Sequence, residues 1–260
     1  MPILDCIIAL YVFVDDQMSD VTDHPQQVLT PSELVTIGIL YALKGTSQSA
    51  FYRWLHFNYR HLFPRLPDRT RLFRRLAAQQ DWTDRFLADV GLLAIADSFG
   101  VEQLHPRRLG RSDKNVAKKG VSNQRWIAGV KVCALINHCG RVADWEWAGA
   151  NTHDTHFRPL VANHPDAAVL TDTGFHGKVG DPENLNVCKK GQCNARFLVE
   201  TVFSLWTRCL SLKKITERHL WRVQAHLAFA IAAFNAVQEL FASQPDDSGR
   251  IPLTMAGICL

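Results

Sequence analysis

The chain contains the stretch Gly91-Leu92-Leu93-Ala94-Ile95-Ala96-Asp97, a short apolar run that ends in a carboxylate. The same pattern returns in Ala167-Ala168-Val169-Leu170-Thr171-Asp172. Between these runs, residues 126–136 and 142–147 have the composition of strands on either side of a turn at 137–140. Short apolar runs bounded by turn residues are typical of buried strands. Together these segments predict a mixed β-sheet.

Helical patterns flank the predicted sheet. Thr30-Pro31-Ser32-Glu33 has the residues of a helix start, with Thr30 as the N-cap and Glu33 three residues later, and Gly45-Thr46-Ser47 ends that helix. A second helix is predicted from Ser47 to Tyr59. Two helices joined by a short turn occur both in DNA-binding helix-turn-helix motifs and in plain helical bundles, and the pattern does not separate the two.

The patterns predict an α/β protein with three parts. Residues 1–90 are expected to form a helical N-terminal region. Residues 91–243 are expected to form an α/β domain, in which 195–210 and 220–240 have helical periodicity without glycine or proline. Residues 244–260 are expected to form a C-terminal tail, which begins with turn residues.

The composition is that of a folded globular chain, with 47% apolar and 21% charged residues among 260. The longest apolar runs, 3–14 and 227–237, are shorter than the roughly 20 residues that a membrane-spanning helix needs. No Lys or Arg precedes the N-terminal apolar stretch, and a signal peptide would have one there. Seven cysteines without a CxxC pair indicate reduced thiols. We therefore expect a cytoplasmic protein with no membrane partner.

Positive charge is concentrated in three segments, although the net charge is only +4. Residues 51–75 hold seven arginines against Asp68 alone, and residues 107–131 and 189–222 form two further basic blocks. A protein that contacts a phosphate backbone over a long track would show such blocks. Any single block is equally well explained as the solvated face of a helix.

Three acids stand in contexts that suit metal-dependent chemistry. Asp97 and Asp172 each end a predicted strand, and Glu200 lies in a predicted helix with an apolar stripe. Converging carboxylates need cations, and all-oxygen ligands favour Mg²⁺ or, as a substitute, Mn²⁺. A pair of such ions assists phosphodiester cleavage. Taken singly, an Asp after a strand is usually a turn or cap residue, and Glu200 would pair with Arg196 one turn earlier.

The segments that hold these acids are Ile95-Ala96-Asp97-Ser98, Leu170-Thr171-Asp172-Thr173-Gly174-Phe175-His176-Gly177 and Arg196-Phe197-Leu198-Val199-Glu200-Thr201-Val202-Phe203-Ser204. They resemble the three motif blocks of bacterial insertion-sequence transposases of the DDE superfamily. The resemblance extends to the segments 117–120, 129–131 and 149–154 and to the leading helices of residues 10–76, so it covers most of the chain.

The resemblance implies an RNase H-like core, a mixed sheet flanked by helices, in which Asp97, Asp172 and Glu200 bind two Mg²⁺ ions. It implies cleavage at the ends of an insertion sequence and joining of the freed 3′ ends to target DNA. The implied partner is double-stranded DNA, bound by a homodimer or a larger synaptic assembly in the bacterial nucleoid.

Expected DNA contacts come from the basic blocks and from the resemblance. Arg196 matches a basic residue that contacts the transposon end. The other expected contacts are Arg208, Lys118, Lys119 and Lys131.

The chain departs from the related pattern at three points. Cys193 and Thr207 stand where many relatives have Tyr and Lys, and Glu200 follows Asp172 by only 28 positions. Arg208 or the pair Lys213-Lys214 would have to replace the missing lysine.

Two alternatives therefore remain open beside the transposase: a catalytically inactive derivative that only binds DNA, and a metal-dependent nuclease without strand transfer. A zinc site at His153, His156, Cys188 and Cys193 is a weaker hypothesis, because the spacing matches no common zinc pattern.

Overall fold

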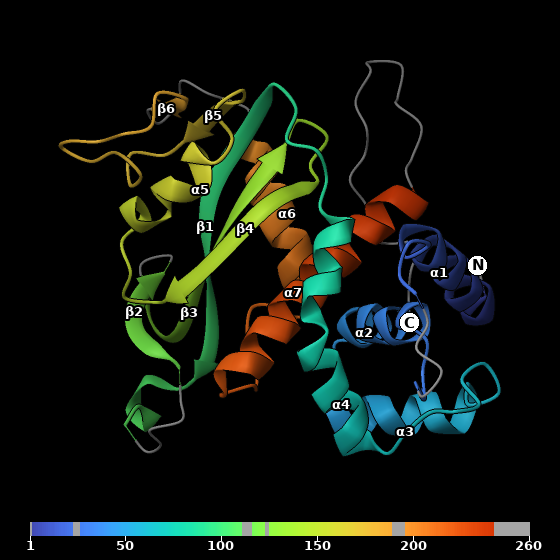
Figure 1. The fold of residues 1–260 in the computed structure, drawn as a ribbon. Helices are drawn as coiled ribbons and strands as arrows, with labels where there is room; N and C mark the ends of the chain where they lie inside the picture. The colour runs from blue at the N-terminus through green and yellow to red at the C-terminus, as the bar shows by residue number, and fades with distance from the viewer. Residues whose placement is uncertain (1, 23–26, 111–115, 123–124, 189–195, 242–260) are drawn as a thin grey trace. The chain divides into compact units, whose positions relative to one another are not determined.

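The chain folds into a helical unit and a unit built on a mixed β-sheet (Figure 1). The computed structural model describes residues 2–22, 27–110, 116–122, 125–188 and 196–241, and it describes only the backbone of Arg196. The helical unit holds the described residues up to Phe86 together with the long helix that follows Leu220, and the sheet unit holds those from Leu87 to Leu220. This division differs from the expected domain 91–243 at that last helix. The expected tail, 244–260, lies outside the described residues.

The helical unit contains five α-helices and one 3₁₀ helix among the described residues. They are α1 (Ile3–Gln17), α2 (Pro31–Lys44), α3 (Gln48–Asn58), α4 (Arg69–Ala78), η1 (Gln80–Phe86) and α7 (Leu220–Leu240). The predicted capping box at the start of α2 is present: Thr30 N donates to Glu33 Oε2 at 2.8 Å, and Glu33 N donates to Thr30 Oγ1 at 3.1 Å. The helix ends at Gly45, as its sequence predicts.

Helices α2 and α7 form the centre of this unit because both are apolar on nearly all sides. Their contact is close at Gly38, where an added Cβ would lie 2.2 Å from Cε1 of Phe229. The one polar break in the apolar run of α7, Asn235, is buried and donates from Nδ2 to Phe86 O at 2.8 Å. Although α7 has 21 residues, no helix in the described ranges is both long and apolar enough to cross a bilayer.

The sheet is mixed, as predicted, and its six strands are β1 (Leu93–Leu104), β2 (Lys118–Ser122), β3 (Arg125–Asn137), β4 (Val142–Gly149), β5 (Ala168–Thr171) and β6 (Leu185–Val187). Its order is β2-β3-β1-β5-β6. One edge of β3 pairs with β1. Along its other edge, β3 pairs first with β2, over residues 125–129, and then with β4, over residues 130–136. Strands β1, β5 and β6 are parallel, whereas β2, β3 and β4 are joined antiparallel.

One expectation about the sheet was wrong. Strand β1 does not end at Asp97 but continues to Leu104, because β3 pairs with it antiparallel along that length. Strand β5 does end immediately before Asp172.

Helices cover both faces of the sheet. On one face, Ala94 and Ala96 of β1 pack in a buried cluster with Leu160 and Val161 of α5 (Arg158–Ala162). On the opposite face, the ring of Phe99 lies against α6 (Arg196–Cys209), with centroid distances of 5.1 Å to Phe203 and 6.1 Å to Trp206. Because side chains alternate along a strand, Asp97 faces the same side as Phe99, toward α6.

We predict that Gly38→Ala destabilises the protein, although alanine normally favours a helix. The new methyl group would overlap the Phe229 ring, and overpacking of this kind costs about 1–3 kcal/mol. Urea denaturation would measure the loss. Phe229→Leu removes the opposing ring, so the double variant should lose less than the sum of the two single variants. Strict additivity would contradict the proposed contact.

Candidate functional site

Asp97 and Asp172 lie side by side because of the register between β1 and β5. The last paired residues of these parallel strands are Ile95 and Leu170, and each Asp comes two positions later. Neighbouring strands lie about 4.8 Å apart, so equivalent positions on them are adjacent. The Asp172 carboxylate also accepts a hydrogen bond from Gly174 N at 2.9 Å, which fixes its side chain at the turn after β5.

A pocket lies along the part of the β1 edge that no strand covers. Pairing with β5 stops at Ile95, and the next chain segment to join this strand pairs at Glu102, where Glu102 N donates to Lys213 O and Ile215 N donates to Glu102 O. The pocket has a volume of about 760 Å³ and includes residues 97–100 of β1 in its wall. The premature end of β5 therefore exposes the β1 edge on which Asp97 stands.

Helix α6 brings Glu200 to the same pocket. Val199, Val202 and Trp206 are fully buried, in agreement with the predicted apolar stripe. Glu200 is exposed, and it lines the pocket together with Thr207 and Arg208 from later turns. The three acids selected from the sequence thus line one pocket.

A fourth acid of the pocket, Asp154, was not selected from the sequence. It begins the 3₁₀ helix η3 (Asp154–Phe157), and its Oδ1 accepts from Lys131 Nζ at 3.1 Å. A Cβ added to Gly174 would lie 3.0 Å from Asp154 Oδ2 and 3.0 Å from Asp172 Oδ1, so these two carboxylates are close neighbours. Asp154 lies near Asp172 only because η3 approaches the turn after β5, and a contact between segments so far apart leaves no local pattern in the sequence. The one sequence feature that pointed to Asp154 was the motif segment 149–154.

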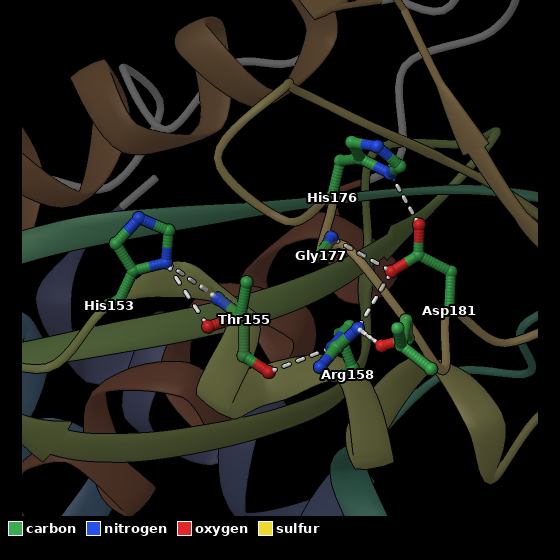
Figure 2. A network of polar contacts seen from close by, with 7 residues as sticks. His153, Thr155, Arg158, His176, Gly177 and Asp181 are labelled. Atoms are coloured by element: carbon green, nitrogen blue, oxygen red, sulfur yellow. Dashed lines mark hydrogen bonds and ion pairs between the residues drawn. The ribbon is translucent and has the colours of Figure 1, made fainter.

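The loop that follows Asp172 is held by a polar network around Asp181 (Figure 2). Asp181 accepts hydrogen bonds from Arg158 Nη1 at 2.7 Å, from Gly177 N at 3.0 Å and from His176 Nδ1 at 2.5 Å. Arg158 Nη1 also donates to Val179 O at 3.1 Å. The Gly177 amide, Arg158 and His176 together lower the pKa of Asp181 to about 2. The loop is thereby tied to α5, which packs under the sheet.

Two acids of the pocket act electrostatically on a buried thiol in the core. Burial raises the pKa of the Cys133 thiol well above its usual value, and the charges of Asp97 and Asp154 raise it further. Cys133 is fully buried in the cluster that Ala94 and Ala96 of β1 share with α5, so it packs in the core.

The expected DNA contacts occupy different environments. Lys118 and Lys119 are exposed on β2, where the Lys119 ammonium lies 4.6 Å from the centroid of the Trp126 ring. Arg208 is exposed at the pocket, whereas Lys131 is mostly buried and paired with Asp154. Arg196 begins α6, and its side chain lies outside the description, as does Cys193.

The pocket supplies oxygen ligands of the kind that Mg²⁺ prefers. In the described part of the chain, no three His, Cys, Asp or Glu side chains are close enough together to hold one ion. Mg²⁺ is commonly bound by one or two carboxylates, with water and substrate phosphates completing its shell. The adjacent Asp97 and Asp172 therefore fit such an ion. His153 of the weaker zinc hypothesis instead caps η3 by accepting from Thr155 N at 3.3 Å.

Compared with models of known protein families and with curated proteins, the chain matches none. The functional inference therefore depends on the geometry of these residues.

We predict that Asp181→Asn lowers the free energy of unfolding at neutral pH, because it removes the charge that Arg158 and His176 bind. The native pKa of Asp181 is about 2, below the roughly 3.9 expected for an unfolded Asp. The stabilisation is therefore complete above about pH 4 and is lost as the pH falls toward 2. Urea denaturation of both proteins from pH 7 downward should show the difference shrinking below about pH 4.

The matched control is Glu183→Gln, which removes an exposed charge from the same loop region. A difference for Asp181→Asn that stays constant or widens below pH 4 would contradict the ion-pair assignment.

Proposed function

We propose that the chain is a DDE-type transposase that cleaves DNA at the ends of an insertion sequence and joins them to target DNA. One observation carries the proposal. Asp97, Asp172 and Glu200 were selected from the sequence by their motif contexts, and all three line one pocket although they come from β1, the turn after β5 and α6.

The architecture of the sheet unit supports an RNase H-like core. The resemblance implies a mixed sheet with flanking helices, and this sheet is mixed and covered by α5 on one face and α6 on the other. The three acids line the pocket at the open edge of β1, on the face of the sheet that α6 covers. We therefore assign the catalytic role to the pocket at that edge.

Asp97 and Asp172 would hold Mg²⁺ between them, and Glu200 would complete the site from α6. The ions would supply charge stabilisation at the attacked phosphate and activation of the attacking oxygen. Asp154 adds a further carboxylate, which Lys131 neutralises at 3.1 Å and holds beside Asp172. Arg208 and Lys213 line the same pocket and would contact the phosphates on either side of the cleaved bond.

The exposed Lys118 and Lys119 offer further contacts to a duplex. Synapsis of two DNA ends would require at least a homodimer, and a protein with this activity would be associated with the bacterial nucleoid. The same proposal includes a DNA-binding helix-turn-helix formed by α2 and α3.

The alternative is an inactive derivative that binds DNA without cutting it. Two observations favour it: Thr207 lines the pocket where many related enzymes are expected to have lysine, and no three acids among the described residues form a ready ligand group. A nuclease without strand transfer would use the same acids.

The test is cleavage of a plasmid that carries the chain's own gene with its flanking DNA, with Mg²⁺ or with EDTA. We predict that the wild-type protein nicks this DNA only with Mg²⁺. Asp97→Asn, Asp172→Asn and Glu200→Gln should each lower the rate at least about 100-fold, because each loses several kcal/mol of transition-state stabilisation. Joining of the cut 3′ end to a second duplex would distinguish a transposase from a nuclease.

Asp166→Asn is the matched control, since it removes an exposed acid that does not line the pocket. DNA affinity measured in EDTA shows whether each variant still folds and binds. Wild-type protein that binds the ends and never cuts with Mg²⁺ or Mn²⁺ would favour the inactive derivative. Cleavage that survives all three substitutions would exclude the pocket as the active site.

A further inference from the structure

The helical unit contains a second pocket, with a volume of about 420 Å³. Its lining comes from the first turns of three helices and from the second turn of α4. The lining residues are Gln48 and Ser49 of α3, Arg69, Thr70, Phe73 and Arg74 of α4, and Trp221 and Arg222 of α7. The pocket joins segments that are far apart in the sequence, and the basic block 51–75 contributes only part of it.

Three arginines line this pocket, and no carboxylate does. Arg69, Arg74 and Arg222 are all exposed, and within the described ranges none of them forms an ion pair with an acid. The Arg69 guanidinium donates to Ser49 Oγ, and the Arg222 guanidinium lies 4.7 Å from the centroid of the Trp221 ring. Guanidinium groups that share a pocket and have no carboxylate partner are suited to binding a phosphate group.

The N-termini of α3, α4 and α7 add to the positive potential that the arginines create at this pocket. The first N–H groups of a helix lack partners within it, and the helix dipole places partial positive charge at that end. Ser47 caps α3 by accepting from Ala50 N, and Asp68 caps α4 by accepting from Arg71 N at 3.0 Å. Asp68 offsets part of the field, but its carboxylate faces the α4 amide and does not line the pocket.

The wall of the pocket also has an aromatic side. Phe73 is buried and packs edge-on against Tyr41, with 4.9 Å between ring centroids, so it forms a fixed floor. Trp221 is 42% exposed and stands at the rim with Arg222. An exposed ring beside arginines that lack an acid partner suits a ligand that presents a sugar next to each phosphate.

We propose that this arginine pocket binds a backbone phosphate of double-stranded DNA. Arg74 and Arg222 would hold the phosphate oxygens, and the Trp221 ring would pack against the adjoining sugar. The choice of DNA as the ligand rests on the proposed function, whereas the affinity for phosphate rests on the pocket alone. The pocket would anchor the duplex without taking part in cleavage.

The experiment measures binding of a fluorescent duplex of about 30 base pairs by anisotropy in EDTA, so that no cleavage is needed. The pocket variant is Arg74→Ala with Arg222→Ala. Arg71→Ala is the matched variant, because it removes an exposed arginine from the same helix outside the pocket. Circular dichroism melting checks that each variant folds.

The pocket variant should weaken binding at least about tenfold at 0.1 M salt, as expected for the loss of charge-assisted hydrogen bonds. The slope of log K against log salt should fall by about 0.9, which corresponds to one phosphate. Arg71→Ala should weaken binding less than about twofold. The single variant Arg222→Lys should bind DNA more tightly than the pocket variant, because it keeps the positive charge at position 222 and leaves Arg74 in place.

Equal losses for the pocket variant and Arg71→Ala would overturn the proposal, since the effect would then be general electrostatic attraction. A second result would overturn the DNA assignment: inorganic phosphate raises the melting temperature of the wild type and not of the pocket variant, while the pocket variant binds DNA as tightly as the wild type. The pocket would then be a site for a small anion. Wild-type protein that binds DNA through this pocket but never cuts would refute the proposed enzyme and leave this inference intact.

Discussion

The candidate site depends on the difference in length between two parallel strands. Strand β5 has four residues and β1 has twelve, so their pairing stops at Ile95 and leaves the following edge of β1 uncovered. The same register that ends there puts Asp97 and Asp172 at equivalent positions. A longer β5 would cover this edge with backbone hydrogen bonds and leave no room for a pocket beside the two acids.

The remaining parts of the site are built around this open edge. Phe203 and Trp206 of α6 pack against Phe99 of β1. This packing fixes the position of α6 along β1 and therefore the place where Glu200 lines the pocket. On the side of β5, the turn that holds Asp172 continues into the loop tied by Arg158 and Asp181. Four carboxylates around one pocket repel one another; Lys131 pairs with Asp154, and Arg208 and Lys213 line the same pocket. The arrangement therefore favours a cation beside the acids of the pocket.

Local signals in the sequence were enough to predict the mixed sheet, the caps of α2 and the apolar stripe of α6, because periodicity and capping act within a few residues. They were not enough for β2, whose sequence Lys-Lys-Gly-Val-Ser lacks strand character and which depends on pairing with β3. Asp154 and the arginine pocket depend on contacts between distant segments. The continuation of β1 beyond Asp97 was missed for the same reason, since β3 supports it.

The two pockets have opposite charge, and this bears on how a phosphodiester would be bound. The pocket at the β1 edge is lined by four carboxylates against three cationic side chains, those of Lys131, Arg208 and Lys213, so its acids oppose a phosphate unless a metal ion offsets them. The arginine pocket has three arginines and no carboxylate, so it would add affinity for DNA without a metal. Part of the affinity for DNA would thus depend on residues outside the catalytic pocket, so a chain that had lost its catalytic function would keep that part.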